Sequence, residues 1–206
     1  YEAQSEAIIR AAIEVRRELG KTISVLIMLP LISSSNEMAY LRGIVEAAAE
    51  RVFKEIDARI EYKVGTMIET PRAALISAQL ALHADFFSFG TNDLTQTTYA
   101  FSRDDAEAKF MSQYLEKKIL DENPFEVLDI QGVGRLIEIA TQEGRRANPK
   151  LEVGICGEHG GEPKSVRFFH EAGLDYVSCS AYRIPVARLA AAQVAIATMA
   201  KVPITA

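Results

Sequence analysis

Three residues that can bind a metal or move a proton follow short, largely apolar runs of the chain. Glu69 and Cys156 each close such a run, and Asp93 follows a third after Gly-Thr-Asn. The runs are Val64 to Ile68, Leu151 to Ile155 and Phe86 to Phe89. Runs of this kind are typical of buried parallel strands, and ligands bind at the carboxyl ends of such strands. We therefore predict that Glu69, Asp93 and Cys156 share one site.

Glu69 and Asp93 supply the hard oxygen ligands that Mg²⁺ prefers. This ion takes one or two carboxylates and fills its other positions with water and substrate oxygens. The alternative is that each carboxylate caps the helix that follows it. No His-x-x-x-His pattern and no Cys-rich pattern occurs in the sequence, which disfavours a zinc site.

The thiol of Cys156 can donate or accept a proton, and the adjacent loop can tune its pKa. That loop, Gly157 to Gly161, is rich in glycine, so its backbone N–H groups can approach an anion. The alternative is that Cys156 is a small buried apolar residue, which is the commoner role of a free cysteine. Cys179 is interpreted in that second way.

Arg103 can hold a phosphate through two hydrogen bonds, or it is a solvated charge in a polar turn, Arg103-Asp104-Asp105. Of the three histidines, only His159 lies near the predicted site in the sequence. His83 and His170 are interpreted as structural.

Helices and strands alternate in the segments that must position these residues. Apolar residues at helical spacing predict helices at 2–19, 37–56, 72–80, 129–147, 163–172 and 185–200, with Ser35 or Asn36 as the cap of the second. Apolar and β-branched runs predict strands at 22–31, 64–69, 151–156 and 175–178, and one from 86 that stops before Asp93. Residues 94–123 are less regular. This alternation predicts a parallel sheet or barrel in a single domain, residues 1–206.

Five strands do not close a barrel, which needs eight. Either the sheet is open and doubly wound, or it is the C-terminal part of a TIM-type (β/α)8 barrel whose first strands lie upstream. The sequence begins with Tyr1 inside a predicted helix, which favours the second interpretation and a fragment of a longer multidomain chain.

Composition narrows the class of partner. The formal net charge of −5 disfavours nucleic acid or an anionic membrane as the main partner. No apolar run is long enough to span a bilayer. The two cysteines make no disulfide framework, so a cytoplasmic protein is expected, with a plastid form left open.

Six segments together resemble the C-terminal, phosphoenolpyruvate/pyruvate-binding domain of the phosphoenolpyruvate-utilising enzymes. They are Val25–Leu31, Gly65–Ala73, Phe86–Gln96, Phe101–Asp105, Val153–Gly161 and Gly173–Ser180, in the order found in the family. The Phe-Ser-Arg-Asp-Asp and Cys-Gly-Glu-His-Gly-Gly stretches are most similar to the pyruvate, phosphate dikinases within the family.

The resemblance implies that Glu69 and Asp93 bind Mg²⁺ together with the carboxylate and enolate oxygens of the substrate. It also implies that Gly90, Thr91 and Asn92 line the substrate site. Phosphoenolpyruvate and pyruvate are the ligands that the resemblance implies.

The resemblance implies that Arg103 contacts the transferring phosphoryl group. It also implies that Cys156 protonates C3 of the enolate when pyruvate forms, and removes that proton in the reverse reaction. The implied overall reaction converts ATP, pyruvate and phosphate into AMP, phosphoenolpyruvate and diphosphate. In the family an ATP-binding domain and a domain carrying a phosphohistidine complete it, and two substrate-binding arginines lie on the first barrel strands. The chain alone is therefore expected to be inactive, or only to enolise pyruvate.

Other functions stay open on the sequence. Phosphoenolpyruvate synthase and enzyme I of the sugar phosphotransferase system share the resemblance. The Ala-rich helix at 186–200 could instead belong to a binding and dimerisation module without chemistry, and a homodimer is expected in either case.

Overall fold

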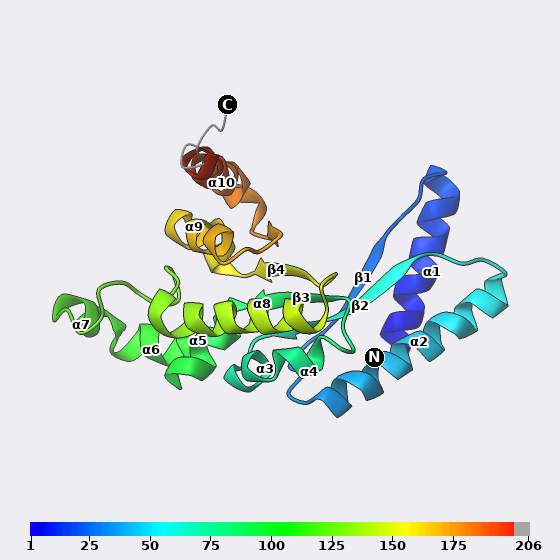
Figure 1. Ribbon diagram of the computed structural model, residues 1–206, viewed down its shortest axis with the longest axis horizontal. Coiled ribbons are helices and arrows are strands. Elements are labelled where there is room, and N and C mark those ends of the chain that lie inside the picture. Colours follow the sequence, from blue (N-terminus) through cyan, green and yellow to red (C-terminus); the bar gives the residue numbers. More distant parts are fainter. Residues whose placement is uncertain (200–206) are drawn as a thin grey trace.

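The computed structural model describes residues 1–199, and its centre is one sheet of five parallel strands (Figure 1). They are β1 (Val25–Leu29), β2 (Tyr62–Ile68), β3 (Phe86–Gly90), β4 (Glu152–Cys156) and β5 (Tyr176–Val177). Their order across the sheet is their order along the chain. Every crossover therefore steps in the same direction, as in a β/α barrel, whereas the order reverses within a doubly wound sheet. The predicted part of a β/α barrel is confirmed, and the doubly wound alternative is wrong.

Ten α-helices are present in the described residues. They are α1 (Glu2–Leu19), α2 (Ser35–Ile56), α3 (Pro71–Leu75), α4 (Ser77–Leu80), α5 (Thr91–Tyr99), α6 (Arg103–Lys109), α7 (Met111–Glu116), α8 (Arg135–Ala147), α9 (Pro163–Glu171) and α10 (Ile184–Met199). Helix α1 packs against α2, and α9 packs against α10 (Figure 1). Within residues 1–199, no helix has the length and apolar character needed to cross a membrane.

Helices cover one face of the sheet. Ile68, Phe87 and Phe89 are fully buried on that face and belong to the main apolar core. Side chains alternate between the two faces of a strand, so Leu26 and Met28 of β1 lie on the other face. These two side chains are 43% and 38% exposed. The sheet therefore buries one face against helices, and the second face is open at β1.

Most predicted elements are present with shifted ends. Helix α1 has the predicted bounds and ends at Gly20, which adopts a left-handed φ of 61°. The cap of α2 is Ser34, whose side chain accepts a hydrogen bond from the Glu37 N–H. The prediction of Ser35 or Asn36 as the cap is therefore wrong. The predicted helix at 72–80 is divided into α3 and α4.

The segment after β3 differs most from the prediction. Helix α5 begins at Thr91, directly after the strand, and continues to Tyr99, into the segment 94–123 that the sequence predicted to be less regular. Ser102 caps α6 and accepts from the Asp105 N–H, so Arg103 starts a helix and does not lie in a polar turn. A π-helical turn, Ile130–Gly134, leads into α8.

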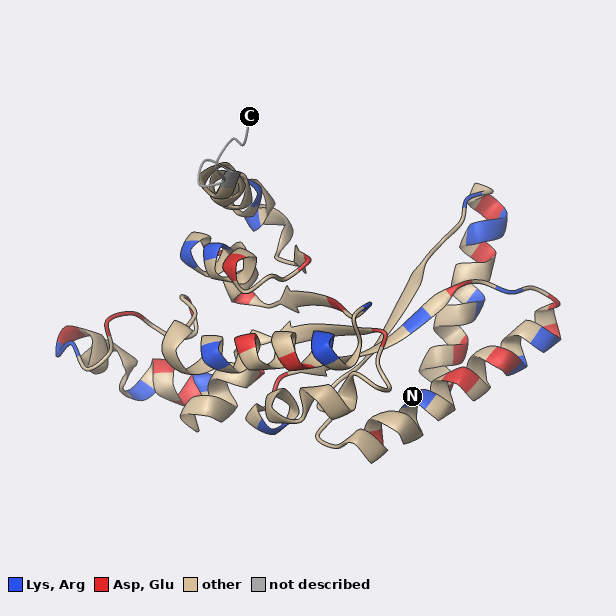
Figure 2. Ribbon diagram, viewed as in Figure 1, with Lys and Arg blue, Asp and Glu red and all other residues tan. Residues whose placement is uncertain are grey.

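Helix α10 differs from the other long helices in its charge. Charged residues of both signs are spread along α1, α2 and α8, whereas α10 carries Arg188 alone (Figure 2). The predicted end of this helix at about 200 lies just outside the described residues.

Candidate active site

The register of the sheet aligns three residues across neighbouring strands. Gly90 of β3 is paired with Cys156 of β4, and Ile68 of β2 is paired with Phe89 of β3. Glu69 comes directly after Ile68 and therefore lies beside Gly90. A Cβ atom at Gly90 would be 2.7 Å from Oε2 of Glu69. Glu69, Gly90 and Cys156 thus form a row at the carboxyl edge of the sheet.

Glu69 is a buried carboxylate, only 3% exposed. The backbone N–H of Leu31 donates a hydrogen bond to its Oε1 at 2.6 Å. Burial raises the pKa of Glu69; the Leu31 hydrogen bond lowers it, and the nearby Asp93 carboxylate raises it further, so that the net shift is upward. Two carboxylates this close destabilise each other in the ionised form, and a cation bound by both would remove that cost.

Asp93 lies in the first turn of α5 and is exposed. The side chain of Gln96 donates to Asp93 Oδ1 at 3.1 Å. Neither carboxylate caps a helix: Thr70 caps α3 through its side chain, and the N-cap position of α5 is Gly90. The capping alternative for Glu69 and Asp93 is therefore wrong.

Glu69 and Asp93 suit Mg²⁺, which needs few protein ligands, better than a metal ion that is held by protein ligands alone. Within the described residues, no group of three or more His, Cys, Asp or Glu side chains could hold a metal ion. Mg²⁺ is bound by one or two carboxylates and completes its octahedron with water and substrate oxygens. The like-charged pair of Glu69 and Asp93 meets that requirement.

Thr91 and Asn92 begin α5 and lie against the loop that follows Cys156. Gly157 has a φ of 125°, and a Cβ atom there would be 2.9 Å from Thr91 Oγ1. Oδ1 of Asn92 is buried and has no hydrogen-bond partner among the described residues. Because an unpaired buried polar group is costly, the Asn92 amide has hydrogen-bonding capacity available for a ligand.

His159 is the buried centre of a small network. Its Nδ1 lies 2.8 Å from Thr91 Oγ1, and its Nε2 lies 2.9 Å from the Pro124 carbonyl oxygen. Burial lowers the pKa of His159, so the ring is neutral at neutral pH. The sequence placed His159 near the site but indicated neither contact.

Arg103 is connected to Asp93 through Gln96. The backbone N–H of Arg103 donates a hydrogen bond to Gln96 Oε1 at 2.8 Å. The Nε2 of the same side-chain amide donates to Asp93 Oδ1. The Arg103 guanidinium lies 5.9 Å from the centre of the Phe125 ring and 3.4 Å from a Glu107 oxygen. Arg103 is thus held on the α5–α6 segment that leaves the carboxyl end of β3 (Figure 1).

Tyr176 is a residue near Cys156 that sequence reasoning missed. Its ring fills the space where Gly154 lacks a side chain. Burial raises the pKa of Tyr176, a hydrogen bond with Ser88 lowers it, and charge on Glu152 and Cys156 raises it. The place of Tyr176 as the second residue of the last predicted strand, 175–178, was the only signal in the sequence. Cys156 and Cys179 are both free and half-buried.

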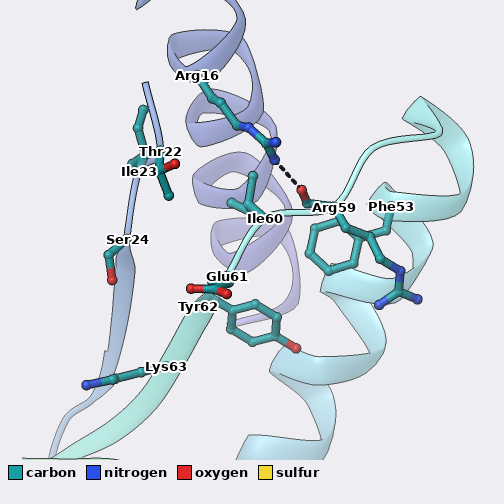
Figure 3. A pocket seen from close by; sticks show the side chains of 10 residues that line it. All are labelled: Arg16, Thr22, Ile23, Ser24, Phe53, Arg59, Ile60, Glu61, Tyr62 and Lys63. Atoms are coloured by element: carbon teal, nitrogen blue, oxygen red, sulfur yellow. Dashed lines mark hydrogen bonds between the residues drawn. The ribbon is translucent and has the colours of Figure 1, made fainter. Parts of the chain in front are cut away.

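A cavity of about 710 Å³ lies elsewhere, at the amino ends of β1 and β2 (Figure 3). Its basic residues have partners already. Arg59 is paired with Glu50 at 2.6 Å and Lys63 with Glu152 at 3.0 Å. Arg16 donates to the Arg59 carbonyl at 2.6 Å, the bond drawn in Figure 3. Two of the three basic residues of this cavity are therefore paired with carboxylates, and the third is bound to a backbone carbonyl.

Comparison with known proteins assigns the family. The model of the PEP-binding domain of PEP-utilising enzymes matches residues 1–196. The chain belongs to this family. The resemblance on which the sequence analysis relied is therefore confirmed.

Similar proteins are named pyruvate, phosphate dikinase. The chain is 56% identical over 193 residues to the chloroplastic enzyme of Mesembryanthemum crystallinum and 56% identical over 196 residues to chloroplastic enzyme 1 of Arabidopsis thaliana. It is 53% identical over 195 residues to the enzyme of Rhizobium meliloti (strain 1021). These matches cover 94%, 95% and 95% of this chain but 20%, 20% and 22% of the relatives. The chain spans about a fifth of the length of the relatives it matches.

A solved structure supports the fold alone. A citrate lyase from Burkholderia xenovorans LB400 has a TM-score of 0.59 and 15% sequence identity, and the match covers 98% of this chain and 60% of that one. This likeness agrees with successive parallel strands of a β/α barrel.

Proposed function

We propose that the chain supplies the phosphoenolpyruvate/pyruvate half of a pyruvate, phosphate dikinase. The observation that carries this proposal is the row of Glu69, Gly90 and Cys156 at the carboxyl edge of the sheet, with Asp93 beside Glu69. Glu69 and Asp93 are two groups that can bind a cation, and Cys156 is a group that can move a proton. The names of the similar proteins favour a dikinase over phosphoenolpyruvate synthase or enzyme I.

Glu69 and Asp93 would hold Mg²⁺, which supplies positive charge where the enolate oxygen develops negative charge. Gly90 keeps the space beside the Glu69 carboxylate free of a side chain, because a Cβ atom there would meet Oε2. Thr91 and Asn92 present the first turn of α5 to the substrate, and the Asn92 amide orients it.

Cys156 moves the proton of the reaction. When the phosphoryl–oxygen bond of phosphoenolpyruvate breaks, the phosphoryl group passes to the histidine of a partner domain and the bond electrons stay on the enolate oxygen. The Cys156 thiol then gives its proton to C3, which yields pyruvate and a thiolate. In reverse the thiolate removes a methyl proton from pyruvate. Residues of this chain thus complete the proton transfer, and Arg103 neutralises charge on the phosphoryl group.

The rest of the reaction needs groups outside residues 1–206. We propose a phosphohistidine-carrying domain and an ATP-binding domain as partners on one longer chain, with residues 1–206 as a single partial barrel. A cytoplasmic or plastid location and a homodimer complete the proposal. The exposed Leu189 and Ile196 on the nearly uncharged α10, 61% and 67% exposed, favour a dimer contact there. Sedimentation of the full-length protein tests it, and a monomer at high concentration would exclude the dimer.

The test of the function is Cys156→Ala in the full-length protein. Pyruvate formation should fall on the order of 10²- to 10⁴-fold, the usual contribution of a general acid, while phosphoenolpyruvate still binds in calorimetry. Cys179→Ala is the matched control and should keep full activity. Undiminished turnover in Cys156→Ala would show that Cys156 is not the proton donor.

A further inference from the structure

We propose that His159 is a positioning residue that fixes two parts of the site at once. Through Thr91 it fixes the first turn of α5, and through Pro124 it fixes the segment that supports Arg103. This inference rests on the proposed function for its kinetic consequences, but the two contacts can be tested without any activity.

The geometry assigns the protons of the network. His159 has no exposed surface, so no water replaces its partners. A carbonyl oxygen can only accept, and so the Nε2–H of His159 donates to Pro124. In the neutral ring Nδ1 is then an acceptor, and it receives the hydroxyl hydrogen of Thr91. His159 therefore uses both ring nitrogens, each in one defined role.

The Thr91 contact acts on the substrate-binding turn. Thr91 is fully buried and is the first residue of α5, directly before Asn92 and Asp93. No side chain caps this helix, because its N-cap is Gly90. The hydrogen bond to His159 therefore holds the start of α5 where a capping side chain is absent.

The Pro124 contact acts on Arg103. Pro124 precedes Phe125, a fully buried residue whose ring lies under the Arg103 guanidinium. Phe125 forms a small separate core with Ala106 of α6 and Met111 of α7. A bond from His159 to Pro124 thus anchors this second core, and Arg103 with it, to the main sheet.

The position of His159 in the chain gives these contacts a functional consequence. It belongs to the 3-10 turn Glu158–Gly161, which follows Cys156 after one residue. One side chain from the loop of the proton donor therefore contacts both the turn that carries Asn92 and Asp93 and the segment that supports Arg103. A residue with a purely local role would need only one of these partners.

Two substitutions separate the two contacts. In His159→Asn the amide oxygen occupies the place of Nδ1 and still accepts from Thr91, but the side chain is too short to reach Pro124. In His159→Gln the amide N–H occupies the place of Nε2 and still donates to Pro124, but Thr91 loses its acceptor. His170→Asn and His170→Gln, on the exposed side of α9, are the matched controls.

The experiment is hydrogen–deuterium exchange of the full-length variants, combined with steady-state kinetics. His159→Asn should speed exchange in peptides around Phe125 and lower kcat about tenfold, whereas His159→Gln should speed exchange at the start of α5 and raise the KM for pyruvate about tenfold. Exchange at the other contact should not change in either variant. Both His170 controls should match the wild type.

Uniformly faster exchange and equal kinetic losses in both His159 variants would overturn the proposal, since His159 would then only stabilise the fold. Unchanged exchange in both would overturn it as well. If the wild type lacked dikinase activity while the two variants still showed separate exchange patterns, the proposed function would fail and the His159 contacts would stand.

Discussion

The carboxyl edge of the sheet and the cavity at its amino edge differ in how their charges are paired. In the cavity, Arg59 has Glu50 as its partner and Lys63 has Glu152. At the carboxyl edge the carboxylates of Glu69 and Asp93 repel each other, and Asn92 Oδ1 has no partner in the described part of the chain. The candidate site is therefore distinguished by unsatisfied charge and hydrogen-bonding capacity and not by the volume of a cavity.

The sharpest test of this comparison removes one carboxylate from each region. Asp93→Asn should lower activity on the order of 10²- to 10³-fold, because it removes one of the two carboxylates that would hold the Mg²⁺ whose charge stabilises the enolate. Glu61→Gln makes the same change in the amino-edge cavity and should leave turnover unchanged. Steady-state assays of both full-length variants check the prediction. Similar losses in the two variants would contradict the separate roles of the two regions.

A smaller effect is expected from Gly90→Ala. The new Cβ would lie 2.7 Å from both Glu69 Oε2 and Met67 Sδ, so these flexible ends must move. Because a carboxylate displaced by about 1 Å can cost up to 10²-fold, activity should fall roughly ten- to a hundredfold. Gly43→Ala on α2 meets nothing within 4 Å and is the control. It should keep full activity and gain about 0.5–1 kcal/mol in the free energy of unfolding.

The raised pKa of Glu69 predicts how Mg²⁺ binding depends on pH. The folded state binds a proton at Glu69 more readily than an ordinary glutamate does, and the proton competes with Mg²⁺. Affinity for Mg²⁺ should therefore fall with decreasing pH, beginning above the usual range of a glutamate.

Asp93→Asn removes the negative charge beside Glu69. The pH at which the affinity for Mg²⁺ begins to fall should therefore be lower in this variant. Calorimetric Mg²⁺ titrations of wild type and variant, from neutral to mildly acidic pH, measure both onsets. Identical onsets would mean that Asp93 does not act on Glu69.

The smallest effect is predicted in the amino-edge cavity. Arg59→Gln breaks the ion pair with Glu50, whose two side chains are 68% and 43% exposed. Such exposed pairs contribute about 0–1 kcal/mol, so urea denaturation should show at most that loss. Activity should not change. A large loss of activity would show that the cavity takes part in the reaction.

The sequence was sufficient to place Glu69 and Cys156 at strand ends, because each follows a short apolar run of the kind that is typical of a buried strand. It did not predict that α5 begins at Thr91, because Gly-Thr-Asn-Asp is typical of a turn and no side chain caps the helix. The contact between Thr91 and His159 joins residues 68 positions apart. Packing of separate elements creates such contacts, and neither spacing nor composition records them.

The central claim is that Glu69, Asp93 and Cys156 act together as one enolisation site. Exchange of the methyl hydrogens of pyruvate for deuterium, followed by proton NMR, tests it most directly because it needs neither ATP nor a phosphohistidine. With the full-length protein the account predicts exchange that requires Mg²⁺ and is lost in Cys156→Ala but kept in Cys179→Ala. Exchange that persists in Cys156→Ala, or its absence from the wild type with Mg²⁺, would contradict the account.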